Sequence, residues 1–201
     1  MPFSTDTLLA LVTFAFVTTV TPGPNNFMLA SSGATFGYWR TLPHIFGVCL
    51  GFPVMLFVVT LGLGEIFRTQ PAVREVVTFA GLGVMLYLAF RIATQNAAKA
   101  KKGTARPLGF FSAAAFQWVN PKAWVLSIGV AATFASGLSP TAEAAISAFV
   151  FLLTGMATAN AWAAAGAALQ RLLGTGIRLR IFNAVLAALL ALSAVWIVVD
   201  R

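Results

Sequence analysis

Long apolar segments without a formal charge dominate this chain. No Lys, Arg, Asp or Glu interrupts residues 7–39, 41–64, 76–90, 123–142, 144–170 or 181–199. A membrane-spanning helix needs about 20 consecutive, predominantly apolar residues. The pattern therefore predicts an all-α, polytopic membrane protein with six transmembrane helices, at about 7–32, 42–64, 73–94, 108–136, 143–169 and 181–199.

Two short segments interrupt these apolar runs with proline and polar side chains. The first is Thr21-Pro22-Gly23-Pro24-Asn25-Asn26, and the second is Asn120-Pro121-Lys122. Proline inside a helix costs about 3 kcal/mol and glycine about 1 kcal/mol. Irregular backbone at membrane depth is tolerated only where protein buries it or where it lines a watery cavity. We therefore expect the helices at 7–32 and 108–136 to be broken at these motifs, and the motifs to bind substrate.

The two breaks also suggest an internal repeat. Thr21-Pro22 and Asn120-Pro121 lie at equivalent places in two halves of three predicted helices each, and an odd number of spans turns the second half upside down. We predict one transmembrane domain over 1–201, made of inverted repeats at about 1–95 and 108–201 and joined by a basic cytoplasmic loop at 96–107. The Gly47-x-x-x-Gly51 spacing and its counterpart at Gly155 and Ala159 are typical of close helix packing.

Composition supports a bilayer location, since 59% of the residues are hydrophobic and 9% are charged, whereas soluble domains carry about 25% charged residues. The single cysteine, Cys49, excludes an intramolecular disulfide. The net charge of +8 does not indicate nucleic acid, because the basic residues flank apolar spans and form no base-stacking face. Anionic lipid headgroups account for them more simply.

The distribution of basic residues predicts the orientation. Of 13 Lys and Arg residues, nine fall in loops on one side: Arg40, Arg91, Lys99, Lys101, Lys102, Arg106, Arg171, Arg178 and Arg180. The positive-inside rule makes that side cytoplasmic. We therefore expect both termini outside, in the periplasm if the membrane is a bacterial inner membrane.

A small set of polar residues within the predicted spans forms the candidate substrate site. Lys122 is the only formal charge deep in a span, where lysine costs about 2.5–3.5 kcal/mol. It could attract an anionic group or carry a proton, and His44, the only histidine, is the other proton-coupling candidate. The full predicted binding set is Thr21, Pro22, Gly23, Pro24, Asn25, Asn26, Gln117, Asn120, Pro121, Lys122, Asn160 and Trp162.

No catalytic constellation, phosphate-binding loop or metal-ligand cluster occurs in the sequence, so neither an enzyme nor a cofactor or metal is expected.

Both break motifs resemble those of a known family. The motif at 21–26 resembles the first-helix signature of the LysE/RhtB amino-acid exporter family, and Gln117-Trp118-Val119-Asn120-Pro121-Lys122 resembles its fourth-helix signature. The segments 29–32, 47–52, 160–163 and 170–172, with Gly166, are most similar to the cysteine/O-acetylserine exporter branch. The resemblance implies six spans in a bacterial inner membrane, ion-driven export of small amino acids with protons as the expected ion, and a homodimer.

One position departs from that family pattern. Many members carry an acidic residue directly after the glycine equivalent to Gly51, and this chain has Phe52 there. Two other functions remain as alternatives, a passive channel for small polar solutes and a membrane-embedded redox protein. Few polar residues outside the breaks argue against the channel, and the lone Cys49 argues against the redox protein.

Overall fold

The computed structural model describes residues 2–95, 105–174 and 176–199, and the secondary structure within these ranges is entirely helical. The helices are α1 (Thr5–Val20), α2 (Pro24–Phe36), α3 (Tyr38–Val58), α4 (Gly64–Thr69), α5 (Pro71–Ala93), α7 (Phe110–Phe116), α8 (Pro121–Phe134), α9 (Pro140–Leu173) and α10 (Ile177–Val199). A π-helical segment, Val59–Leu63, joins α3 to α4, and a 3₁₀ turn, Gln117–Val119, joins α7 to α8. Most of the predicted basic loop, at 96–104, lies outside the described residues.

Four continuous helical segments are long and apolar enough to cross a membrane, namely Tyr38–Thr69, Pro71–Ala93, Pro140–Leu173 and Ile177–Trp196. The pair α1 and α2 passes as a fifth span, bent by 53° between Val20 and Pro24. The predicted helix at 108–136 is instead two short helices separated by the turn before Pro121. Both proline motifs therefore break their helices, while the count of six spans and the inverted repeat remain predictions.

The predicted helix limits are too short at several ends. The helix expected at 143–169 runs from Pro140 to Leu173, and the one expected at 42–64 begins at Tyr38 and continues through the π segment to Thr69. The predicted end at residue 169 comes too early because Arg171 lies in the last turn of α9, where a basic residue is favourable. Proline at the first helical position starts α2, α5, α8 and α9.

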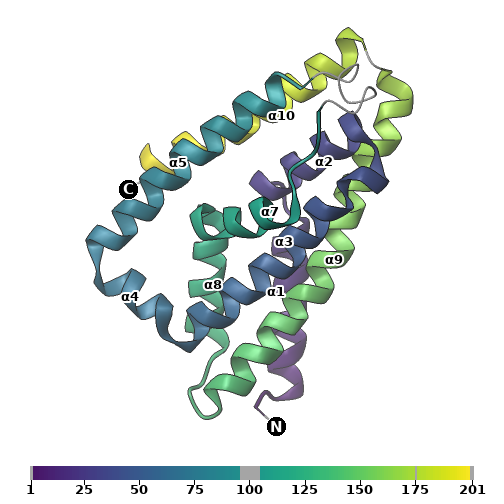
Figure 1. The fold of residues 1–201 in the computed structure, drawn as a ribbon. Helices are drawn as coiled ribbons and strands as arrows, with labels where there is room; N and C mark the ends of the chain where they lie inside the picture. Colours follow the sequence, from purple (N-terminus) through teal and green to yellow (C-terminus); the bar gives the residue numbers. More distant parts are fainter. Residues whose placement is uncertain (1, 96–104, 175, 200–201) are drawn as a thin grey trace.

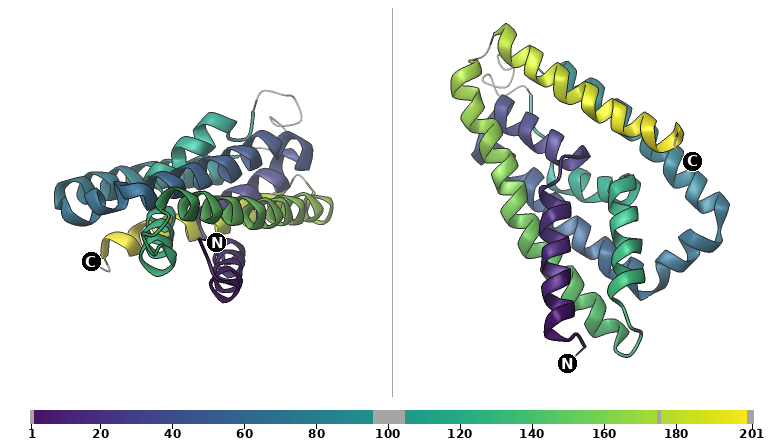
Figure 2. Two further views of the ribbon diagram at one scale, coloured as in Figure 1. Left: turned by 90° about the horizontal axis from the view of Figure 1, so that it is seen from below. Right: turned by 180° about the vertical axis from the view of Figure 1, so that it is seen from behind.

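The long helix α9 packs against α1, α2 and α3, while α5 and α10 lie side by side along another edge of the molecule (Figures 1 and 2). Glycines bring α2 and α9 into backbone contact. A Cβ built on Gly166 would lie 2.1 Å from the carbonyl oxygen of Ala30, and one on Gly33 would lie 2.1 Å from that of Ala163. The outward surfaces carry exposed apolar side chains, including Phe111 and Trp196, as expected of helices that face lipid.

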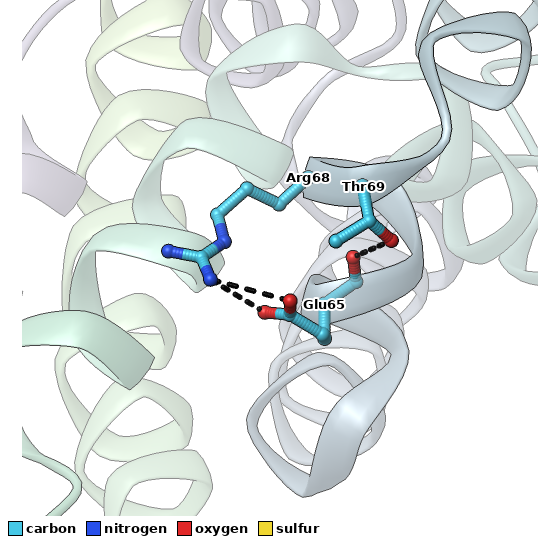
Figure 3. A network of polar contacts seen from close by, with 3 residues as sticks. All are labelled: Glu65, Arg68 and Thr69. Carbon is cyan, nitrogen blue, oxygen red and sulfur yellow. Dashed lines mark hydrogen bonds and ion pairs between the residues drawn. The ribbon is translucent and has the colours of Figure 1, made fainter.

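The turn from α3 into α5 carries a small polar network on α4. Arg68 and Glu65 form an ion pair of 3.1 Å, and the Thr69 hydroxyl donates to the Glu65 carbonyl at 2.8 Å (Figure 3). Both charged side chains are largely exposed. An exposed pair of this kind contributes about 0–1 kcal/mol to stability, so it does not determine the fold of this turn.

Candidate functional site

At the first break, side chains from elsewhere bind the backbone carbonyls that α1 leaves without helical partners. The amide nitrogen of Asn26 donates to the carbonyls of Thr19 and Thr21, both at 2.9 Å. The indole nitrogen of Trp162, on α9, donates to the carbonyl of Val20 at 3.3 Å. Pro24 has no N–H to give Val20, so Trp162 provides the missing donor. This arrangement stabilises an interrupted helix inside the molecule.

At the second break, Asn120 caps the new helix. Its side-chain oxygen accepts a hydrogen bond of 3.1 Å from the backbone N–H of Lys122, which satisfies one of the free donors at the start of α8. Trp124 in the first turn of α8 donates its indole N–H to the carbonyl of Trp118 at 2.8 Å. The ring of Phe67 stacks on Trp124 with the ring centroids 4.2 Å apart. The start of α8 is therefore held on two sides.

The two breaks meet in space. The Lys122 ammonium donates a hydrogen bond of 3.0 Å to the carbonyl of Thr21, across 101 positions of sequence. Asn25 and Gln117 exchange two amide hydrogen bonds, of 2.9 and 3.2 Å. Gly23 allows the close approach of Lys122, because a Cβ there would lie 3.1 Å from the lysine Cδ and 3.2 Å from Nζ.

A cavity of about 560 Å³, including its open mouth, lies between the breaks and helices α3 and α9. Its polar wall comes from both breaks: Thr18, Thr19, Gly23, Asn25, Asn26, Asn120 and Lys122. Its remaining wall is mostly apolar: Val48, Cys49, Phe52, Pro53, Ala123, Leu126, Phe151, Gly155, Thr158 and Ala159. Such a mixture, apolar with a few converging polar groups, is typical of a small-molecule site.

The charge of this cavity is positive. Lys122 lines it, and no acidic residue in the described part of the chain does so. Phe52 lies in the wall and packs edge-to-face on Phe151 with the ring centroids 5.4 Å apart. The cavity thus offers a cation to an incoming ligand and an aromatic surface near it.

The N-terminus of α2 adds to this preference for an anion. Gly23 is its N-cap and makes no side-chain hydrogen bond to the first turn, in contrast to Asn120 on α8. Free backbone N–H groups at a helix start, together with the helix dipole, attract negative charge. Gly23 is also where Lys122 makes its close approach, so the two positive features coincide.

The structure gathers some of the predicted site residues and separates others. Gly23, Asn25, Asn26, Asn120 and Lys122 line the cavity. Thr21 acts through its carbonyl and Gln117 through its pairing with Asn25, while Pro22, Pro24 and Pro121 shape the breaks without lining the cavity.

Asn160 and Trp162 do not line this cavity, and their contact with substrate stays a prediction. Asn160 accepts a hydrogen bond from the Tyr38 hydroxyl and donates to the carbonyl of Met156 at 2.6 Å. Trp162 stabilises the first break through its hydrogen bond to the carbonyl of Val20. Both were chosen because they are polar or aromatic within a span, and this property does not reveal which way a helical side chain points.

Several lining residues carry no polar signal in the sequence. Gly155 is the clearest case, since a Cβ built there meets nothing within 4 Å. Gly47 and Gly51 are different, because their Cβ atoms would lie 2.4 Å from the Phe110 carbonyl and 2.6 Å from the Ala114 Cα. The spacing of Gly47 and Gly51 therefore indicates close helix packing on α3, whereas Gly155 on α9 borders open space.

His44 lies away from this cavity. It is buried in α3, with Nδ1 3.1 Å from the Ser32 hydroxyl, and it lines a second cavity with Arg91 and Arg106. The two proton-coupling candidates, Lys122 and His44, are therefore in separate places.

Comparison with known proteins decides the family. The model of the family described as LysE type translocator matches residues 16–201. The chain belongs to the LysE type translocator family. Membership places this LysE chain among membrane-spanning efflux transporters rather than enzymes, which agrees with its apolar helices.

Curated relatives of this LysE chain cover almost its whole length. It is 31% identical over 193 residues to the cysteine/O-acetylserine efflux protein of Escherichia coli (strain K12), covering 95% of this chain and 97% of that protein. It is 32% identical over 199 residues to the protein of that name from Klebsiella pneumoniae, covering 98% and 100%. No solved structure matches this LysE chain.

Proposed function

We propose that this LysE-family chain is a secondary active exporter of small amino acids or their derivatives in a bacterial inner membrane. The observation that supports this best is the cationic cavity between the two helix breaks. The names of the relatives, cysteine/O-acetylserine efflux protein, favour a small neutral amino acid or an O-acyl derivative.

The substrate carboxylate binds at the meeting point of Lys122 and the start of α2. A charge-assisted hydrogen bond between an ammonium and a carboxylate is about twice as strong as a neutral one. Lys122 then exchanges the Thr21 carbonyl, its partner in this structure, for the ligand. The uncapped N–H groups of α2 supply further donors to the same oxygen atoms.

The substrate ammonium and side chain occupy the rest of the cavity. Pro22 has no N–H to give the carbonyl of Thr18, so the end of α1 offers an acceptor, and the amide oxygens of Asn25, Asn26 and Asn120 offer more. The wall formed by Val48, Phe52 and Phe151 suits a short aliphatic or acylated side chain. These features select zwitterions with small side chains.

Alternating access follows if the halves of the chain are inverted repeats that rock against one another. The contacts Lys122–Thr21 and Asn25–Gln117 both join the first break to the second. They are therefore the hydrogen bonds that such a movement must stretch or exchange. With both termini outside, substrate enters from the end of the molecule that carries Arg40, Arg91, Arg106 and Arg171.

The driving force we propose is the proton gradient. Lys122 and His44 are the candidate proton carriers, because no acidic residue in the described part of the chain lines the cavity between the breaks. If Lys122 carries the proton, binding of the carboxylate and of the proton occur at one side chain and are coupled directly. If His44 does so, coupling must pass along α3 to the cavity wall at Val48 and Cys49.

Thermal stability of the purified protein against neutral amino acids, across pH, tests the proposal. A ligand at 100 times its Kd stabilises the folded state by about 2.7 kcal/mol. We expect stabilisation by O-acetylserine, cysteine or a similar amino acid, its loss in Lys122→Met, and partial retention in Lys122→Arg. Arg178→Gln, at an exposed arginine away from the cavity, is the matched control. An unchanged ligand response and export rate in Lys122→Met would remove Lys122 from the mechanism.

Proteoliposomes separate export from the two alternatives. Saturable uptake that responds to an imposed pH gradient supports a transporter, whereas single-channel currents would indicate a passive channel. Transport that survives Cys49→Ser excludes a thiol redox role, even though Cys49 lies in the cavity wall.

A further inference from the structure

A second cavity, of about 320 Å³ including its open mouth, lies where α2, α3, α5 and the segment before α7 meet. The polar residues that line it are Ser32, His44, Arg91, Gln95 and Arg106. No residue of this set belongs to the cavity between the breaks. The second cavity is therefore a separate place with its own chemistry.

His44 supplies an unused hydrogen-bonding group to this cavity. The residue is 1% exposed, and its Nδ1 contacts the Ser32 hydroxyl at 3.1 Å. Its Nε2 atom is buried and has no hydrogen-bond partner among the described residues. A buried polar atom left unpaired costs about 1–3 kcal/mol. When Ser32 donates to Nδ1, the ring hydrogen lies on Nε2 and is free for a ligand.

Two guanidinium groups share the cavity with this ring. Arg91 lies in the last turn of α5, and Arg106 follows Ala105, whose carbonyl accepts a 2.9 Å hydrogen bond from Arg40 on α3. None of the four acidic residues that the structure describes lines the cavity. Arginine presents several N–H donors in a planar fork that matches carboxylate and phosphate oxygens. The donor set is thus cationic and lacks an anionic partner.

We propose that this second cavity binds a small oxyanion, a carboxylate or a phosphate, with His44 Nε2 donating to one oxygen and Arg91 and Arg106 neutralising the charge. The ring of His44 is buried, whereas Arg91 and Arg106 are exposed. An oxyanion satisfies all three groups, whereas the two arginines repel a cation.

The same two helices connect this site to the cavity between the breaks. Ser32 lies about 9 Å along α2 from Asn26, and His44 lies about 6 Å along α3 from Val48, at 1.5 Å of rise per residue. The second site then holds the carboxylate of an amino acid before it reaches Lys122. This staging role rests on the proposed export function, whereas oxyanion binding itself does not.

The single histidine permits a direct test. Protein carrying ¹⁵N-labelled histidine and a histidine-free affinity tag shows the ring nitrogens of His44 alone. Inorganic phosphate or acetate, titrated at constant ionic strength, should shift these signals saturably. Arg91→Gln and Arg106→Gln should each weaken the apparent affinity about tenfold, while Arg178→Gln, at an exposed arginine elsewhere, should leave it unchanged.

The composition of the surrounding membrane mimetic distinguishes a lipid phosphate from a free anion as the ligand. A free anion shifts the His44 signals equally in nanodiscs of phosphatidylcholine and of phosphatidylglycerol. A lipid phosphate, which both lipids carry, shifts them in nanodiscs relative to dodecyl maltoside micelles before any phosphate is added. Either result supports the oxyanion site. Signals that stay fixed in every condition, or that shift equally in the Arg91 and Arg106 variants and the wild type, overturn it.

Phosphate binding at His44 without amino-acid export would leave the site standing and reject only the staging role.

Discussion

Asn25 and Gln117 form a reciprocal amide pair, in which each side chain both donates to and accepts from the other, at 2.9 and 3.2 Å. Asn25 lies in the first turn of α2 and Gln117 in the turn before α8. Gln117 is fully buried and also donates to the carbonyl of Ala113. The pair therefore ties the first helix break to the second directly beside the cavity.

This pair should couple energetically. Asn25→Ala and Gln117→Ala should each destabilise the protein, and the double variant should cost less than the sum, with a coupling of about 0.6–1.7 kcal/mol as found for hydrogen bonds within membranes. Reversible unfolding in mixed micelles measures all four proteins. Gln70→Ala, at an exposed amide on the turn before α5, is the control for loss of an amide. Strict additivity of the two changes would contradict the pairing.

Gly23 should be required for the position of the Lys122 ammonium. Gly23→Ala places a methyl group 3.2 Å from Nζ, so the lysine side chain must shift by a few tenths of an ångström, which should weaken its hydrogen bond to the Thr21 carbonyl. Since the backbone at Gly23 is extended, alanine strains nothing else. We expect about tenfold weaker amino-acid binding with little change in unfolding temperature. Gly83→Ala, which meets open space on α5, should leave amino-acid binding unchanged and stabilise the helix by about 1 kcal/mol. Equal binding by the two variants would refute the requirement.

Gly155 should determine how much space the substrate has. Its Cβ position is open, so Gly155→Ala should fold normally and strengthen α9 by about 1 kcal/mol. Gly155→Leu should fill part of the cavity and slow export of larger amino acids before smaller ones, as initial rates in proteoliposomes would measure. Gly166→Ala on the same helix should instead destabilise by about 1–3 kcal/mol, because its Cβ meets the Ala30 carbonyl at 2.1 Å. A Gly155→Leu variant with wild-type selectivity would show that the substrate lies elsewhere.

Phe52 should keep the cavity free of negative charge. Phe52→Glu introduces a carboxylate into the cavity that holds Lys122, and the two opposite charges should pair. We expect weaker binding of the substrate carboxylate and a changed dependence of export on pH, compared with Phe52→Leu, which removes the ring without adding charge. Binding affinities measured over a range of pH would test this. Equal affinities and pH profiles for the two variants would count against a role for the cavity charge.

Much of this site could be predicted from the amino-acid sequence alone. Pro22, Gly23 and Pro24 cannot continue α1, and Lys122 cannot face lipid without a large cost, so both helix breaks and the half-buried cation were predictable. The hydrogen-bond partners of Asn160 and Trp162 were not, because a helical span has several faces and the sequence does not identify the neighbour of each. Gly155 was predicted as a packing residue for the same reason, although its Cβ position is open.

The sequence by itself determined that the chain is a helical membrane protein and that two of its segments must be interrupted, since unpaired backbone groups and a formal charge are too costly in hydrocarbon. Only the tertiary structure decided that Lys122 reaches Thr21, that Phe52 and Gly155 line the same cavity, and that His44 faces two arginines elsewhere. The physical reason is that a polar or charged group cannot remain unpaired in lipid, so it must have a hydrogen-bond partner inside the protein. Which partner it has depends on how the helices pack, and close contacts at glycines determine that packing.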